Sequence, residues 1–204
     1  MKLYYSKGAC SLSTHIIINE LQLDCEFESV DLGTKTTESG ADFYNINPRG
    51  AVPTLQLDSG DLLIENLAIQ QYLTDKFDLQ HQLCPAVGTL QRYNVLAWLS
   101  FAASDLHKSF TPFFSYKNVD AKTSEMFTAT LKAKLAHLEK QLINNDYIAG
   151  TAYTLPDAYI FVTLRWLVAA KLDLADWPRL SAYFDRVKAR PAVNQSMKQE
   201  GLPV

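Results

Sequence analysis

The chain has 204 residues, a mass of 22.9 kDa, 48% hydrophobic residues and 20% charged residues. This composition allows a buried core and excludes a disordered or fibrous chain. The formal net charge is -3, and no cluster of lysine and arginine is interleaved with aromatic residues, so we expect no nucleic-acid partner.

The N-terminus and the longest apolar stretch argue against export and against a membrane span. The apolar start of the chain is interrupted at residues 6–8, so it lacks the continuous apolar region of a secretory signal. The stretch from Ala158 to Ala170 contains Arg165 and is too short to cross a bilayer. We therefore expect no association with membranes.

The cysteines are few and irregularly spaced. There are three cysteines, an odd number, and they do not have the spacing of metal ligands: Cys10, Cys25 and Cys84. Such a set argues against a disulfide scaffold and against a zinc site, and it suits a reducing compartment. We therefore expect a cytoplasmic protein without a bound metal.

From Met1 to about Asp78 the sequence alternates between extended and helical patterns, which predicts an α/β unit. Strands are predicted at residues 3–5, 27–32, 54–57 and 62–64, and helices at residues 12–21 and 66–72. The turn-forming residues 58–61 join the last two strands, which should form an antiparallel hairpin. The sheet should therefore be mixed.

Cys10 follows the first strand and a turn at Gly8, and it begins the first predicted helix. A cysteine there faces unpaired backbone N–H groups and the positive end of the helix dipole, which can lower its pKa to between about 3.5 and about 7.5. Cys10 and Ser13 form a C-x-x-S pattern, which permits a mixed disulfide but no local one. The alternative is an inert buried cysteine, and the local motif leaves both interpretations open.

A turn at residues 47–50 leads into Val52 and Pro53, directly before a predicted strand. A cis peptide bond before Pro53 would expose the backbone N–H and C=O groups of Val52 to an extended peptide ligand. A trans bond at a strand start is the more common alternative.

Glu65 and Asn66 lie where a strand ends and a helix begins. The first N–H groups of that helix could bind an anion, and the Glu65 carboxylate could bind an ammonium group, so together they suit the zwitterionic end of an amino acid. The alternative is a simple helix cap. Lys35 could bind another carboxylate, although a solvated lysine is the usual case.

The segment from Phe77 to Val87 loses its periodicity and contains Pro85, as a linker does. Beyond Thr89 the apolar residues recur with helical spacing, which predicts an all-α second half. We therefore expect two domains, residues 1–80 and residues 87–204.

Within the helical half, a polar stripe and a helix cap stand out. Ser100, Ser104 and His107 follow helical spacing, which by itself indicates a solvated face. Thr154 and Asp157 have the spacing of a capping box ahead of an apolar helix that should form the centre of this domain. We interpret Asp157 as a folding residue rather than a catalyst.

The order of these motifs along nearly the whole chain resembles that of the cytosolic glutathione transferases, and the cysteine points to the bacterial beta class. The resemblance implies a thioredoxin-like N-terminal domain with a mixed sheet, an all-α C-terminal domain and a homodimer. It also implies a role in detoxification, with glutathione as the co-substrate, a small electrophile as the second substrate and no metal.

The resemblance assigns roles to individual residues. Cys10 and His107 are the implied catalytic residues, with Lys108 beside His107 near the sulfur. Ser104 is implied to reach glutathione in the other subunit. The residues implied to bind glutathione are Tyr5, Ser11, Lys35, Val52, cis-Pro53, Glu65, Asn66, Ser100, Ser104 and Lys108. Two of them depart from the family pattern: Ser100 stands where asparagine is expected, and Asn66 where glycine or serine is usual.

The predicted function is a glutathione transferase that conjugates glutathione or exchanges it with disulfides, with an accessory thiol-disulfide reductase activity. Tyr5 and Ser11 are rivals of Cys10 as the group that activates the sulfur of glutathione. The alternative function is a non-catalytic binding or regulatory protein on the same fold. Turnover of an electrophile or a disulfide distinguishes the two.

Overall fold

The computed structural model describes residues 1–116 and 118–203, and its contacts divide the chain into two units. Unit 1 comprises Met1–His81 and Arg190–Val204, and unit 2 comprises Gln82–Ala189. The predicted division into residues 1–80 and 87–204 differs from these units at the C-terminus. Within the described residues, no helix is both long and apolar enough to span a bilayer.

The sheet of unit 1 is mixed, as predicted. Its strand order is β3-β2-β1-β4-β5; β1 and β2 are parallel, and the other neighbours are antiparallel. The strands are β1 (Lys2–Tyr5), β2 (Glu26–Asp31), β3 (Thr36–Thr37), β4 (Thr54–Gln56) and β5 (Leu62–Ile64). The predicted hairpin is β4 and β5, with Leu55 opposite Leu63. The two-residue strand β3 was not predicted because it is too short for an alternating pattern.

Successive residues of β1 point to opposite faces of the sheet, and both faces are covered. Leu3 is fully buried on one face, where unit 1 carries the helices α1 (Ser11–Glu20) and α2 (Asn66–Phe77). Tyr4, on the other face, packs with Val30 and Phe43, the latter from a short 3-10 turn (Phe43–Asn45). This covered sheet provides a rigid base for the loops that precede α1, β4 and α2.

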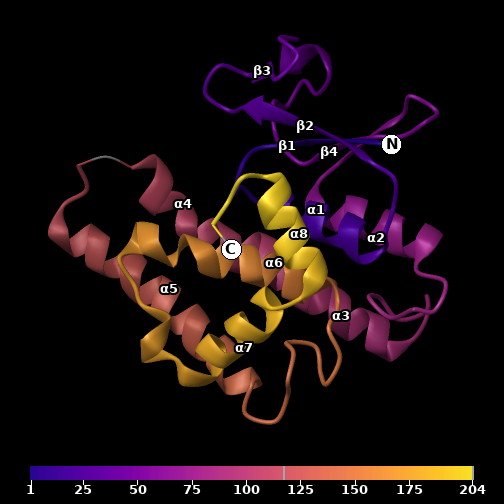
Figure 1. Cartoon of the computed structure of the whole chain (residues 1–204). Helices are drawn as coiled ribbons and strands as arrows, with labels where there is room; N and C mark the ends of the chain where they lie inside the picture. Colours follow the sequence, from indigo (N-terminus) through magenta and orange to yellow (C-terminus); the bar gives the residue numbers. More distant parts are fainter. Residues whose placement is uncertain (117, 204) are drawn as a thin grey trace. The chain divides into compact units, whose positions relative to one another are not determined.

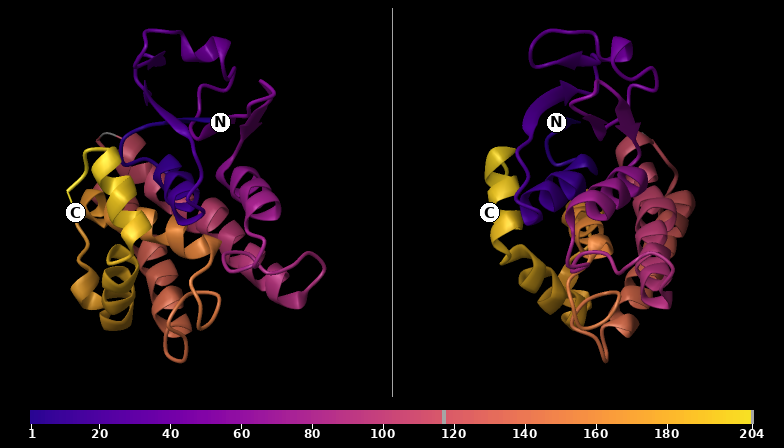
Figure 2. Two further views of the ribbon diagram at one scale, coloured as in Figure 1. Left: turned by 45° about the vertical axis from the view of Figure 1, so that its right-hand side comes forward. Right: turned by 90° about the vertical axis from the view of Figure 1, so that its right-hand side faces the viewer.

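The C-terminal helix α8 (Pro191–Gln199) joins unit 1 because it packs along α1, as Figures 1 and 2 show. Arg190, just before α8, makes two hydrogen bonds of 2.6 and 2.8 Å to the carboxylate of Glu20. Asn19 donates to Ser196 of α8 at 2.7 Å. These polar contacts explain why the last segment groups with the first.

Unit 2 is helical, as predicted, and its centre is the nearly all-apolar helix α6. The helical segments are α3 (Leu90–Ser100), a π-helical segment (Phe101–Leu106), α4 (His107–Ser115), α5 (Ala121–Gln141), α6 (Leu155–Leu164), 3-10 segments at Arg165–Ala170 and Leu174–Asp176, and α7 (Pro178–Lys188). All residues of α6 are buried. The predicted capping box is present at its start: the Asp157 carboxylate accepts from the Thr154 N–H at 2.8 Å.

Candidate active site

Cys10 lies at the N-cap of α1, where the sequence predicted it. Its thiol donates to the carbonyl oxygen of Val52 at 3.4 Å. Its own carbonyl lies within hydrogen-bond distance of the Ser13 hydroxyl, at 2.8 Å, and of the Asn66 amide nitrogen, at 3.2 Å. The sulfur is therefore held between three segments of unit 1: the start of α1, the loop before β4 and the start of α2.

The expectation of a lowered cysteine pKa is wrong. Burial raises the pKa of the Cys10 thiol to about 11, and the nearby Glu65 carboxylate acts in the same direction. The Asn66 side chain and the backbone N–H groups of Cys10 and Ser11 lower it by less. Loss of water around the sulfur outweighs the helix N-terminus, so the resting group is a neutral thiol.

The loop before β4 presents the Val52 backbone beside this thiol. The Val52–Pro53 peptide bond is cis, as the resemblance implied. Asn47 is buried and its amide holds the loop, donating to the carbonyl of Ala51 and to the hydroxyl of Thr54, both at 2.9 Å. The sequence analysis assigned no role to Asn47, although its position four residues before Ala51 fits a side chain that closes a turn.

Lys35 lies beside the same loop. Its ammonium group donates to the carbonyl of Gly50 at 2.8 Å, and none of the ion pairs found among the described residues involves it. Gly50 has a φ of +57°, and a Cβ there would come within 2.7 Å of the Tyr44 ring. The glycine therefore lets the chain pass under Tyr44 and Lys35, and no acid among residues 1–116 and 118–203 pairs with the lysine.

Glu65 lies immediately before α2 in a strained conformation, with a φ of 72°. Its carboxylate is largely exposed and forms an ion pair with Arg49 at 2.6 Å. Arg49 belongs to the loop that holds Val52, so the ion pair links the two loops, and sequence reasoning gave Arg49 no role. An exposed residue whose backbone has a positive φ is often retained for function rather than for packing.

The Asn66 side chain faces inward, not toward solvent. Asn66 is 5% exposed, and its Oδ1 accepts from the hydroxyls of Thr14 at 2.7 Å and Ser13 at 3.0 Å, while its amide nitrogen donates to Cys10. The predicted glutathione contact was to the Asn66 backbone N–H, which lies in the first turn of α2 and has no acceptor within that helix. The side chain supports Cys10 instead.

Tyr5 and Ser11, the two rivals of Cys10, differ in their surroundings. Burial raises the pKa of the Tyr5 hydroxyl, with a further contribution from Glu200, so Tyr5 stays a phenol. The Ser11 hydroxyl is fully buried and makes its hydrogen bonds with the backbone of Ser6, at 3.1 and 3.3 Å. This geometry favours a structural role for Ser11, in the turn that precedes α1.

The remaining predicted site residues lie in unit 2, around the π-helical segment. Ser100 and Ser104 are exposed, and the Ser104 hydroxyl donates to the carbonyl of Ser100 at 2.8 Å. Lys108 is exposed on α4. π-helical turns cost stability and are frequent at functional sites, and no local pattern at residues 101–106 predicts this one.

His107, the first residue of α4, is partly buried. Its Nδ1 is 2.8 Å from the Tyr159 hydroxyl, and its ring meets the Trp166 ring edge-on with centroids 4.9 Å apart. Burial lowers the pKa of the His107 imidazole to about 4, and the charge of Lys108 acts in the same direction. His107 is therefore neutral near pH 7. Tyr159, which fixes the ring, was read from the sequence only as a core residue.

No group of three or more histidine, cysteine, aspartate or glutamate side chains that could hold a metal ion occurs in the described part of the chain. The candidate site in unit 1 consists of the Cys10 thiol, the peptide backbone at Val52, the Lys35 ammonium group, and the Glu65 carboxylate with its partner Arg49. Such a set can hold a small peptide by its backbone and its charged ends, with the thiol beside its middle residue.

Comparisons with known proteins point to one family. Residues 8–76 match the family described as Glutathione S-transferase, N-terminal domain, and residues 120–186 match that described as Glutathione S-transferase, C-terminal domain. The chain is 40% identical over 202 residues to Glutathione S-transferase GstA of Escherichia coli O157:H7, covering 99% of this chain and 100% of the relative.

Two solved structures are similar over the whole chain, each with a TM-score of 0.93 and coverage of 100% of both chains. One is a sphingomonad glutathione S-transferase complexed with glutathione, at 42% identity. The other is a bacterial beta class glutathione S-transferase from Sphingomonas chungbukensis, at 39% identity. These likenesses confirm the predicted fold class, a thioredoxin-like domain with a mixed sheet followed by an all-α domain.

Proposed function

Because this chain belongs to the glutathione S-transferase family, among its bacterial beta-class members, we propose that it uses glutathione at the sulfur of Cys10. The second substrate is a small electrophile, to which glutathione is conjugated, or a disulfide, with which it is exchanged. The sphingomonad relative whose structure contains glutathione supports the choice of this tripeptide.

One observation carries the proposal: the Cys10 thiol lies 3.4 Å from the Val52 carbonyl, beside the cis-proline loop. An extended peptide that paired with the Val52 backbone would place its central residue next to this sulfur. The central residue of glutathione is cysteine. Pairing at Val52 would therefore bring the two sulfurs together and remove part of the entropic cost of their reaction.

The charged groups of unit 1 suit the two ends of glutathione. Lys35, whose charge no acid neutralises within the described residues, suits the glycyl carboxylate. Glu65 suits the ammonium group of the γ-glutamyl end, and the first N–H groups of α2, starting at Asn66, suit its carboxylate. Tyr5 is proposed to line this site as well, whereas the buried Ser11 supports the turn before α1.

The exchange reaction needs no group beyond the two thiols. The Cys10 thiolate attacks the glutathionyl sulfur of a mixed disulfide between glutathione and another thiol; a new S–S bond forms to Cys10, and the other thiol leaves as its thiolate and is protonated. A second glutathione thiolate then attacks the mixed disulfide, releases the Cys10 thiolate and carries away the disulfide. Each step breaks one S–S bond and forms another, so the electrons balance.

The helical unit supplies the remaining proposed residues. His107, neutral and held by Tyr159, would accept or donate a proton near the sulfur, and Lys108 would add a positive charge there. Ser100 would contact glutathione of its own subunit, and Ser104 would reach that of the second subunit in a homodimer. We place the protein in the cytoplasm, where glutathione keeps thiols reduced.

A non-catalytic glutathione-binding protein is the second candidate, and turnover separates the two. Wild type should bind immobilised glutathione and turn over chlorodinitrobenzene or a small mixed disulfide of glutathione. The variant Lys35→Ala should bind glutathione more weakly, while Lys122→Ala, at an exposed lysine of α5, should be unchanged. Binding without turnover of either substrate would favour the non-catalytic protein, and no binding would contradict both.

A further inference from the structure

A buried polar network lies beneath Cys10, between the starts of α1 and α2. Its members are Asn66, Ser13, Thr14 and Gln70, all at most 5% exposed. The Gln70 amide donates to Ser13 at 3.0 Å, and the hydroxyls of Ser13 and Thr14 lie 3.0 and 2.7 Å from Asn66 Oδ1. Buried polar groups cost free energy unless they are paired, so a network of this kind fixes the side chains that it contains.

The network fixes the orientation of the Asn66 amide. Because the Cys10 carbonyl oxygen can only accept a hydrogen bond, the end of the amide that faces it is the NH₂ group, and Oδ1 is left to accept from the hydroxyls of Thr14 and Ser13. The NH₂ nitrogen is 3.2 Å from the Cys10 carbonyl oxygen. An NH₂ group has two protons, so one can bond this carbonyl while the other remains for a neighbouring acceptor.

We propose that Asn66 is a positioning residue for the reacting sulfur: its amide anchors the Cys10 backbone and offers a hydrogen bond to the sulfur when the thiol loses its proton. Ser13 of the C-x-x-S motif contributes by its hydrogen bond to Asn66 Oδ1. It does not resolve a disulfide, because it has a hydroxyl in place of a thiol.

The charges around Cys10 agree with this role. The Asn66 side chain is the strongest of the influences that lower the pKa of the Cys10 thiol, ahead of the backbone N–H groups of Cys10 and Ser11. Glu65, the charged group that acts on the thiol, raises the pKa and is itself paired with Arg49. Val52, on the remaining side, contributes only its carbonyl group, which accepts from the neutral thiol. Asn66 is therefore the side chain that favours the thiolate.

The test measures the alkylation rate of Cys10 by iodoacetamide at pH 9, without glutathione, with Cys25 and Cys84 replaced by serine in every variant. Asn66→Ala should slow alkylation by about tenfold, the change that corresponds to one pKa unit. Asn66→Asp, which keeps the shape, should slow it further, because an oxygen would face the carbonyl and the sulfur in place of the NH₂ group. It also serves as the test variant if Asn66→Ala does not fold.

Thr74→Val is the matched control. Thr74 is equally buried on α2, but its hydroxyl bonds only to carbonyls of its own helix, at 3.0 and 3.2 Å. Its loss should leave the alkylation rate unchanged while lowering stability. An unchanged rate in Asn66→Asp, or an equal slowing in Thr74→Val, would overturn the proposal.

This inference rests on the proposal that Cys10 is the reacting sulfur, but the two can fail separately. The alkylation rate reports on the thiol alone, so a rate that responds to Asn66 in a protein that never reacts with glutathione would disprove only the proposed function. If the protein forms its glutathione adduct at Cys10 but the alkylation rate does not change when Asn66 is replaced, only this inference is disproved.

Discussion

At the scale of single residues, burial keeps two groups of the candidate site neutral. It raises the pKa of the Cys10 thiol to about 11 and lowers the pKa of the His107 imidazole to about 4. Both shifts disfavour the charged form, as loss of hydration does. Near pH 7 the Cys10 thiol, which is partly exposed, is therefore protonated, and its reactivity should rise with pH.

The first prediction concerns the pH dependence of Cys10. Because the thiolate is the reactive form, the alkylation rate should rise about tenfold per pH unit from pH 7 to pH 10 without a plateau. The measurement is made on the variant with Cys25 and Cys84 replaced by serine. A plateau reached below pH 8 would mean that the helix N-terminus dominates after all.

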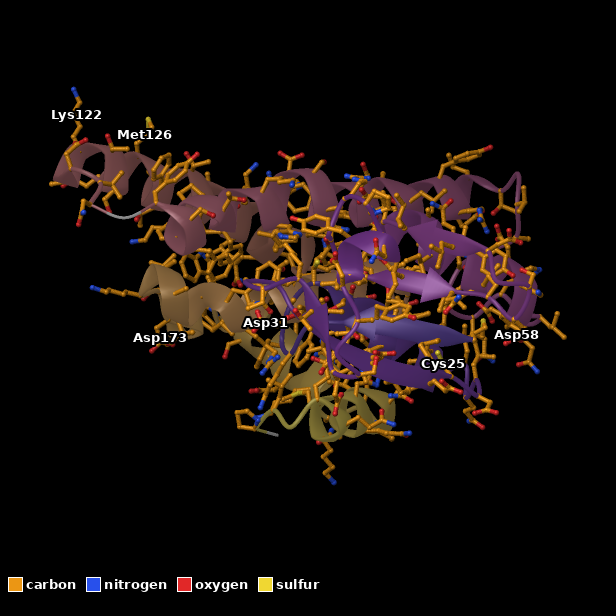
Figure 3. The ribbon with its side chains drawn as sticks, turned by 90° about the horizontal axis from the view of Figure 1, so that it is seen from above. Cys25, Asp31, Asp58, Lys122, Met126 and Asp173 are labelled. Carbon is orange, nitrogen blue, oxygen red and sulfur yellow. The ribbon has the colours of Figure 1, made fainter. Side chains whose placement is uncertain are left out.

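Cys25 needs this replacement because it is partly exposed and could react as well. It lies near the Met1 amine, whose ion pair with Asp58 marks one edge of unit 1 (Figure 3). Burial raises the pKa of Cys25 to about 11 too, so the two thiols cannot be separated by pH. Cys84 is buried and should react last.

The second prediction concerns the loss of folding stability that acid causes through His107. Its pKa is lower in the folded chain than the usual 6.5, so the unfolded chain binds the proton first and stability falls as the pH drops from 6.5 toward 4. Between pH 7 and pH 5 this should cost on the order of 1–2 kcal/mol. Urea unfolding at both pH values should show a smaller loss for His107→Gln than for wild type.

The control for this experiment is His81→Gln, at an exposed histidine. Removal of His81 should leave the acid-induced loss of stability as it is in wild type. An equal loss in wild type and in His107→Gln would show that other groups account for the acid sensitivity.

At the scale of elements, α8 and the loop before α1 meet at a buried carboxylate. The Glu200 side chain is fully buried; it accepts from the Gly8 N–H at 2.8 Å and lies 3.1 Å from His15 Nδ1. His15 is itself buried and stacks on Phe27 with ring centroids 3.9 Å apart. The C-terminal segment therefore contributes to the placement of the turn two residues before Cys10.

The third prediction follows from this contact. Glu200→Ala removes a buried carboxylate that accepts from the Gly8 N–H and lies beside His15 Nδ1, so it should lower the free energy of unfolding by about 3 kcal/mol or more. Gln195→Ala, at an exposed position of α8, should change it by less than about 0.5 kcal/mol. Similar urea midpoints for the two variants would argue against a structural role of Glu200.

The fourth prediction compares two helix caps. The buried Asp157 carboxylate accepts from the N–H groups of Ile148 and Thr154 and from the Tyr183 hydroxyl, at 2.8–3.0 Å. Asp157→Ala should therefore lower the free energy of unfolding by about 3 kcal/mol, whereas Asp120→Ala, at the exposed cap of α5, should lower it by clearly less. Thermal or urea unfolding measures the loss of stability in both variants. Equal losses would contradict the expectation that burial makes the Asp157 interactions more important for stability than those of Asp120.

Much of the architecture could be predicted from local pattern. The strand at residues 62–64, the mixed sheet and the capping box at Thr154 all follow from periodicity and turn chemistry, which act over a few residues. The packing of α8 on α1 could not be predicted, because it depends on pairs such as Glu20 with Arg190, far apart in sequence. No local signal distinguishes such a pair from two solvated charges.

The candidate site likewise combines features that local sequence predicts with features that depend on the fold. The position of Cys10 at a helix N-terminus was predictable, but its raised pKa was not, because burial comes from segments that only the fold brings to it. Likewise the sequence marked Glu65 and Asn66 as a helix start. It could not tell that the Asn66 side chain turns inward to Cys10 while Glu65 turns outward to Arg49.

The whole molecule consists of a unit that carries the Cys10 thiol beside a cis-proline loop and a helical unit that carries the neutral His107. The family places these two units in one enzyme, and the chain matches it in both. The central claim is narrower: that the sulfur of glutathione reacts at Cys10. It can be tested without knowledge of the second substrate.

The most direct test is to incubate the protein with oxidised glutathione at pH 9 and to weigh it intact. Wild type should gain glutathionyl mass that reduced thiols remove, the variant lacking Cys25 and Cys84 should gain one such group, and Cys10→Ala, which keeps the other two cysteines, should lose the group carried by Cys10. Absence of the adduct on wild type, or an undiminished adduct on the variant without Cys10, would contradict the account.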